Sequence, residues 1–125
     1  MGDFKRLVAW QKAHAYMIAV RAAFNGRRTG AAPGLRAQVL RAVSSIPDNL
    51  AEGCGKRSRR ALASYADNAY SSAKEVENDL IKSRDLGILP RVCAKISYAR
   101  VTRWLASVSA SLAAHRRASD VPLNA

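Results

Sequence analysis

The 125-residue chain has the length of a single domain, and its 21 Lys and Arg against nine Asp and Glu give a formal net charge of +12. This charge favours polyanionic partners such as nucleic acid or an anionic membrane surface, with simple solvation of the surface as the competing explanation. Two cysteines without CxxC spacing indicate neither a zinc framework nor a disulfide scaffold, and no stretch approaches the roughly 20 apolar residues that span a bilayer.

The first predicted helix spans about residues 6–25, where apolar side chains recur at alternating three- and four-residue spacing on one face. They are Trp10, Ala13, Met17, Val20 and Phe24. The next segment, residues 25–34, contains three glycines and Pro33, which are incompatible with a continuing helix. We therefore expect a flexible connection there.

The second predicted helix spans about residues 35–54 and contains Pro47. Proline removes one backbone hydrogen bond and crowds the carbonyl of Val43, so a kink is expected near Ser44 and Ser45. The alternative is a helix that stops at Ser45 and restarts with Pro47 in its first turn.

A polar motif begins at Pro47, and its expected role is structural. We place Asn49 and Glu52 on the apolar side of the helix, where they would satisfy backbone groups that the kink releases. Gly53 continues the same four- and three-residue pattern as the apolar positions before it. The predicted structural motif consists of Pro47, Asn49, Glu52 and Gly53.

The third predicted helix spans about residues 58–86, with Ser58 as its N-cap and mostly small residues along its core seam. Small residues let helix axes approach closely, and the 3.5-residue period of the seam indicates near-antiparallel packing. Gly87 and Pro90 suit the end of this helix and the start of a fourth, over about residues 90–117. Nothing shows the period-two alternation of a strand, so the predicted fold is all-α, an antiparallel up-down four-helix bundle.

A glycine-framed basic loop joins the second and third predicted helices. Its four cations stand at the positive end of a helix, which is unfavourable unless an anion binds there. They are Lys56, Arg57, Arg59 and Arg60. The loop matches a phosphate-binding P-loop poorly because Arg57 separates Lys56 from Ser58 and a helix precedes it. Its amides and cations would still suit a nucleic-acid phosphate. The alternative is that these side chains extend into solvent and bind no ligand.

The up-down topology places this loop at the same end as both chain termini. Arg116 and Arg117 end the fourth predicted helix, where cations interact favourably with the helix dipole even without a ligand. Together with Lys5 and Arg6 they would create a cationic end from residues distant in sequence. We predict no catalytic residue, cofactor or metal site, because the histidines and cysteines lack partners at suitable spacing.

Five of the nine acids fall on the third predicted helix, at Asp67, Glu75, Glu77, Asp79 and Asp85. We expect them to pair with arginines of neighbouring helices or of another subunit, with a solvated face as the alternative. The candidate partners in this chain are Arg41, Arg100 and Arg103.

Four segments resemble the bacterial four-helix bundle family that includes proteins encoded in intervening sequences of 23S ribosomal RNA genes. They are residues 7–14, residues 45–53, the spacing of Ser72, Glu75 and Glu77, and residues 85–89. Ser71 departs from the glycine that the family usually has there. The resemblance implies a cytoplasmic antiparallel bundle that assembles as a ring-like homopentamer, with no established activity for many members. Related accessory proteins of diversity-generating retroelements form basic pentameric barrels that bind nucleic acid and a reverse transcriptase, but only the fold is carried over here.

The leading functional hypothesis is a non-enzymatic, homo-oligomeric bundle that binds RNA or DNA phosphates through its cationic end, without cofactor or membrane association. The alternative is an assembly or adaptor module that binds an unidentified protein, with the charge serving solubility and subunit pairing.

Overall fold

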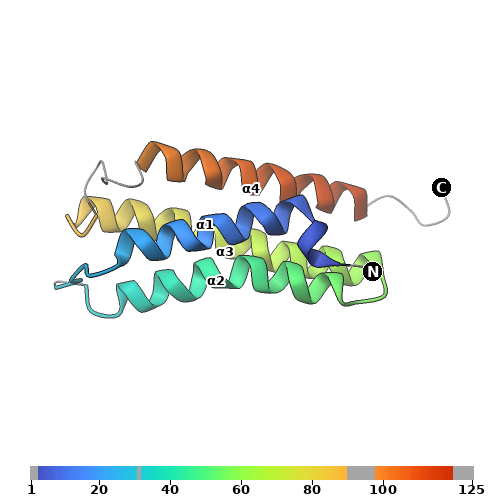
Figure 1. The fold of residues 1–125 in the computed structure, drawn as a ribbon, viewed down its shortest axis with the longest axis horizontal. Helices are drawn as coiled ribbons and strands as arrows, with labels where there is room; N and C mark the ends of the chain where they lie inside the picture. Colours follow the sequence, from blue (N-terminus) through green and yellow to red (C-terminus); the bar gives the residue numbers. More distant parts are fainter. Residues whose placement is uncertain (1–2, 31, 90–97, 120–125) are drawn as a thin grey trace.

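The computed structural model describes residues 3–30, 32–89 and 98–119, except for the side chains of 98–102 and 115–119. Within these ranges all regular secondary structure is helical, and Figure 1 shows that successive long helices run in opposite directions. The elements are the 3-10 helix η1 (Phe4–Arg6) and the α-helices α1 (Val8–Phe24), α2 (Leu35–Cys54), α3 (Arg59–Asp85) and α4 (Tyr98–Ser119). The predicted all-α four-helix bundle is confirmed.

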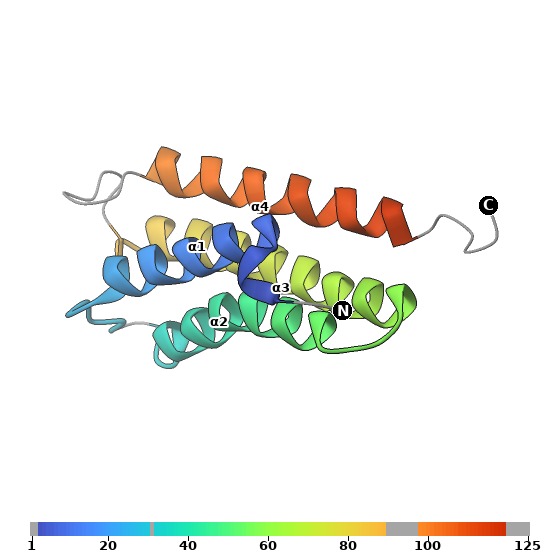
Figure 2. The same cartoon turned by 45° about the vertical axis from the view of Figure 1, so that its right-hand side comes forward.

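The helices are arranged as a ring of four neighbours. In the described part of the chain each helix contacts the next, and α4 closes the ring against α1, while α1 with α3 and α2 with α4 lie on the diagonals. The turned view in Figure 2 shows α4 and α2 on opposite sides of α1 and α3. None of the described helices is long and apolar enough to cross a membrane.

One apolar core fills the space between the helices, and small residues dominate the contribution of α3. Ala66, Ala69 and Ala73 are all completely buried, as the predicted seam requires. On α1 the buried stripe is shifted slightly from the predicted one, because Tyr16 is fully buried whereas Met17 is only partly buried. The shift is one residue, so the predicted face of α1 is largely right.

The beginning of the chain differs from the prediction of one helix over residues 6–25. Leu7 is extended, with φ −74° and ψ 120°, and it separates η1 from α1. Asp3 caps η1 and not α1, since its side chain accepts a hydrogen bond from the Lys5 N–H at 3.0 Å. The second predicted helix has the bounds of α2, Leu35–Cys54.

Pro47 lies inside a continuous α2, so the alternative of a helix that stops at Ser45 and restarts is wrong. The kink itself stays a prediction. For α4 the start expected near residue 90 lies outside the described residues, and its described end is Ser119 rather than residue 117.

The two ends of α3 follow from their capping residues. Ser58 is the N-cap, and its hydroxyl accepts a hydrogen bond from the Ala61 N–H at 3.1 Å. After Asp85 the chain turns at Gly87, whose φ is +73°. The N–H of Gly87 donates to the Arg84 carbonyl and that of Ile88 to the Ser83 carbonyl, at 3.0 and 2.9 Å. This pair of bonds is a Schellman motif, which needs a left-handed residue and therefore favours glycine.

Candidate nucleic-acid interface

The loop between α2 and α3 is a helix end followed directly by a helix cap. Gly55 is the C-cap of α2, and its N–H donates to the carbonyls of Ala51 and Glu52 at 3.2 and 3.1 Å. Only three residues later Ser58 caps α3. Because an α-helix and not a strand precedes this loop, the structure agrees with the rejection of a nucleotide-binding P-loop.

All four loop cations are exposed. Lys56, Arg57, Arg59 and Arg60 extend from the loop and from the first turn of α3, which contains no acidic residue. The Lys56 ammonium lies 5.6 Å from the centre of the Tyr65 ring, a cation–π contact within the same end of the bundle. The remaining three side chains are guanidinium groups, which match phosphate oxygens in a bidentate geometry.

The topology brings further cations to this end, as predicted from the sequence. Figure 1 shows the α2–α3 loop, η1 and the final turns of α4 at one end of the bundle. Lys5 and Arg6 are exposed on η1, which contacts both α1 and α2. Arg116 and Arg117 lie in the last turns of α4, which packs against α3, although their side chains are outside the described atoms. We call this set of eight residues the cationic end. Its members are Lys5, Arg6, Lys56, Arg57, Arg59, Arg60, Arg116 and Arg117.

Gly53 has a packing role in positioning this end. A methyl group added at its α-carbon would lie 2.9 Å from Cβ of Tyr65 and 3.0 Å from Cδ1 of Leu62. Glycine at this position therefore lets α2 and α3 approach closely just before the loop that joins them. Gly53 thus has a packing role between the two helices.

Asn49 forms hydrogen bonds within the proline-containing segment, whereas Glu52 is exposed. The Asn49 side-chain amide donates to the Ser45 carbonyl at 2.7 Å and to the Ser45 hydroxyl at 3.0 Å. That hydroxyl also lies 2.6 Å from the hydroxyl of Ser72, which ties α2 to α3.

The placement of Glu52 on the apolar side is wrong, because its side chain is exposed. Five residues after the buried Pro47, Glu52 lies about 140° around the helix axis and so points away from the core. Nothing in the structure explains a further role for Glu52.

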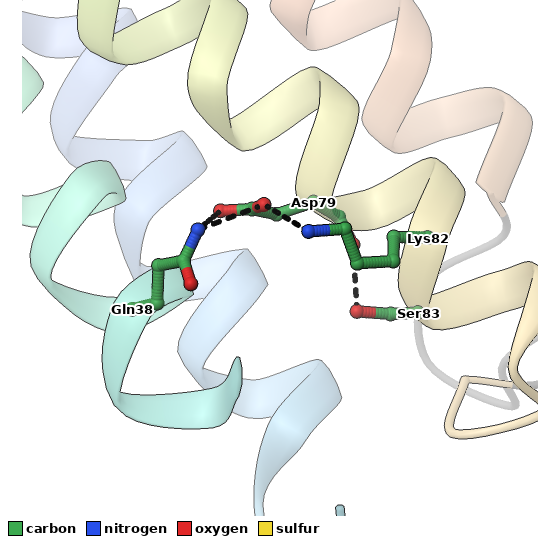
Figure 3. Close-up of polar contacts among 4 residues, drawn as sticks. All are labelled: Gln38, Asp79, Lys82 and Ser83. Atoms are coloured by element: carbon green, nitrogen blue, oxygen red, sulfur yellow. Dashed lines mark hydrogen bonds and ion pairs between the residues drawn. The ribbon is translucent and has the colours of Figure 1, made fainter. Parts of the chain in front are cut away.

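Asp79 is a buried carboxylate that the sequence analysis counted only as one of five acids available for pairing with arginine. Its side chain is 1% exposed, and Figure 3 shows it between Gln38 of α2 and Lys82 of α3. The Gln38 amide donates to both carboxylate oxygens at 3.2 and 3.3 Å, and the Lys82 ammonium lies 3.8 Å away. Burial raises the pKa of Asp79, while the charge of Lys82 acts in the opposite direction.

The detectable signal for Asp79 was its spacing, since it follows the buried Val76 by three residues and precedes Leu80 by one. Ser83, one turn further, donates its hydroxyl hydrogen to the Asp79 carbonyl at 2.7 Å. Asp79 and Ser83 are buried, whereas Lys82 is exposed, and the contact of Asp79 with Gln38 fastens α3 to α2.

Three acids of α3, Glu77, Asp79 and Asp85, pair along their own helix, and the side chain of Arg100 lies outside the described atoms. Glu77 pairs with Lys74 at 3.3 Å and Asp85 with its neighbour Arg84 at 3.1 Å. In the described structure Arg41 and Arg103 are exposed and form no ion pair, which corrects the expectation of cross-helix pairs through these two residues. Ion pairs form readily between residues three apart in a helix, because their side chains already lie on one face.

Other chemically reactive residues do not form a site among the described residues. No group of three His, Cys, Asp or Glu side chains able to hold a metal occurs there. Cys54 is buried, and burial raises the pKa of its thiol, which disfavours the nucleophilic thiolate. His14 stacks on Trp10, with ring centres 4.8 Å apart.

Fold and surface together define a class, that of basic four-helix bundles whose cations gather at one end. A family model described as 23S rRNA-intervening sequence protein matches residues 5–110. The chain therefore belongs to the 23S rRNA-intervening sequence protein family. The match extends past the segments that carry the resemblance and includes the first half of α4. No curated protein matches the chain.

Proposed function

We propose that this chain is a non-enzymatic nucleic-acid-binding protein whose cationic end holds the phosphates of RNA or DNA. The observation that carries the proposal is the gathering of exposed cations from η1 and the α2–α3 loop at the end where α4 also finishes. The name of the family refers to intervening sequences of 23S ribosomal RNA, which makes RNA the first ligand to test.

The start of α3 gives this proposal its energetic direction. Arg59 and Arg60 occupy the first two helical positions, where a positive charge opposes the helix dipole by about 0.3 to 1 kcal/mol each. A phosphate bound beside them would reverse the sign of that term and accept hydrogen bonds from the first backbone amides. Contacts of this kind read no base, so little sequence preference is expected.

The test compares two variants that each remove four positive charges. One replaces the loop cations (K56Q, R57Q, R59Q and R60Q), and the matched control replaces exposed arginines elsewhere (R27Q, R28Q, R41Q and R103Q). Fluorescence anisotropy with labelled single-stranded RNA and the same DNA sequence is measured over a range of salt concentrations.

We expect the loop variant to bind much more weakly than the control variant. If the four cations each neutralise one phosphate, the slope of log affinity against log salt falls by about 3 for a single strand. A loop variant that binds as the wild type does would remove the loop from the proposed interface.

We infer further that a second copy of the chain covers the outer face of α1. Val8 and Ile18 are each 54% exposed there, and Ala15, one heptad after Val8, is exposed as well. Such a stripe is typical of a helix that packs against another helix. The resemblance favours a pentamer as the assembly.

Light scattering tests this assembly with the wild type and an Ile18→Glu variant. The wild type should have the mass of an oligomer, and the variant a lower mass with unchanged helix content, because a charge in the contact disfavours it. A monomeric wild type at working concentration would contradict the inference. If the chain also bound no nucleic acid at low salt, the assembly or adaptor function would remain, with this face as its contact surface.

A further inference from the structure

A polar groove lies between α1 and α2 at the end of the bundle away from the α2–α3 loop. Figure 1 shows the end of α1 and the start of α2 together at that end. The groove has a volume of about 240 Å³. Its lining consists of Arg21, Ala22, Asn25, Arg36 and Leu40. Pockets for drug-sized ligands hold roughly 300 to 1,000 Å³, so this groove suits one small polar group rather than a whole cofactor.

Two exposed arginines from different helices face this groove. Among the described residues neither Arg21 nor Arg36 has an ion pair or a side-chain hydrogen bond. Two acids in the last turns of α3 are already engaged, since Asp79 contacts Lys82 and Asp85 contacts Arg84. Two guanidinium groups beside one groove repel each other, and an anion between them would replace that repulsion with charge-assisted hydrogen bonds.

The start of α2 supplies a second, independent argument for an anion. Gly34 is its N-cap with φ +84°, and in the described structure no side chain caps the helix by a hydrogen bond. The first turn contains no acidic residue, and Arg36 is its second residue. No residue of α2 therefore compensates the positive end of this 20-residue helix, which lies beside the groove. In contrast, Ser58 caps α3.

We propose that this groove is a separate phosphate-binding site, in addition to the cationic end. Arg21 and Arg36 bind phosphate oxygens with their guanidinium forks, and the Asn25 amide donates a further hydrogen bond. Ala22 and Leu40 form the apolar part of the wall. The ligand is a phosphate group of a free nucleotide or of a nucleic-acid chain, and this site does not depend on the proposed role of the loop.

The experiment measures thermal unfolding with added pyrophosphate, adenosine monophosphate or a short RNA, each against sodium chloride at equal ionic strength. It compares the wild type with R21Q/R36Q and with a control, R41Q/R103Q, that removes the same charge from exposed positions outside the groove. We expect pyrophosphate to raise the melting temperature of the wild type and of the control. R21Q/R36Q should lose most of this increase while melting normally in chloride, because both side chains are exposed.

Several results would overturn the proposal. Pyrophosphate could stabilise R21Q/R36Q as much as the wild type, or both double variants could lose the effect equally, which would indicate a general response to charge.

A third variant, with the four loop cations replaced by glutamine, separates the two sites. If it alone loses the effect, the phosphate binds at the loop, which refutes the groove and supports the proposed function. If it keeps the effect and R21Q/R36Q loses it, the groove is established whatever the loop does. A response to adenosine monophosphate assigns the site to free nucleotides, and a response to RNA alone assigns it to nucleic acid.

Discussion

At the scale of single residues, burial sets the proton affinity of the Asp79 carboxyl group apart from that of an exposed aspartate. Its carboxylate is 1% exposed and is held by Gln38 and Lys82, so the charged form has lost water and gained only partial compensation. Burial accordingly raises the pKa of this carboxyl. Buried charges of this kind tend to specify which helix faces meet rather than to add net stability.

Asp79→Asn should change how stability depends on pH. A carboxyl whose pKa rises on folding binds more protons in the folded state. Its contribution to the free energy of unfolding is therefore full below its unfolded pKa of about 3.9, and it is lost as the pH rises through the folded pKa. The asparagine variant lacks this dependence.

Urea unfolding of wild type and D79N from pH 4 to 7 checks this prediction, and taking the difference cancels the other titrating groups. The wild type should lose stability relative to the variant as the pH rises. A difference that stays flat would show that Lys82 and Gln38 balance the burial of the carboxylate, and one that grows in favour of the wild type would show that they outweigh it.

At the scale of elements, the contact between α2 and α3 depends on small and polar residues. Gly53 permits the close approach near the loop, and the hydroxyls of Ser45 and Ser72 meet at 2.6 Å further along the same pair of helices. The alanines of α3 continue the close packing. The helix pair that presents the loop cations is therefore held together by close packing and by a hydroxyl pair.

Gly53→Ala should destabilise the fold by about 1 to 3 kcal/mol, because its new methyl group would lie 2.9 Å from Cβ of Tyr65. Gly55→Ala is the milder comparison, since Gly55 is exposed with φ −76° and its added methyl group would lie 3.3 Å from the Glu52 carbonyl oxygen, so it should cost less than Gly53→Ala. Urea unfolding at one protein concentration measures both variants. If the two variants had the same free energy of unfolding, α2 and α3 would make room for the methyl group at residue 53 without loss of stability.

Local signals account for what the sequence predicted well. The cap at Ser58, the turn at Gly87 and the seam of alanines are all read within one or two helical turns, and they place α3 correctly. The extended Leu7 and the exposed Glu52 were missed because neighbouring helices and the exact rotation of a face decide them. Spacing alone does not fix that rotation.

The sequence did not predict that Arg21 and Arg36 lie beside the same groove, for a related reason. Each arginine looks like an ordinary surface residue of its own helix, and only the antiparallel packing of α1 on α2 brings both to one groove. The cationic end, in contrast, could be predicted because up-down connectivity alone determines which loops and termini meet.

At the scale of the whole molecule, the net charge of +12 is distributed by the topology. Neither α1 nor α4 contains an acidic residue, whereas α3 contains five that are partly neutralised along its own length. The excess of cations is therefore left at the helix ends and on α1 and α4. A field of this kind attracts a polyanion without selecting its sequence.

The salt dependence of RNA binding by the wild-type protein tests the central claim most directly. Anisotropy with single-stranded RNA should show binding at low salt. If six of the eight residues at the cationic end each neutralise one phosphate, log affinity should fall with log salt at a slope of about −4. Absence of binding at low salt, or an affinity that does not change with salt, would contradict a nucleic-acid interface built from these cations.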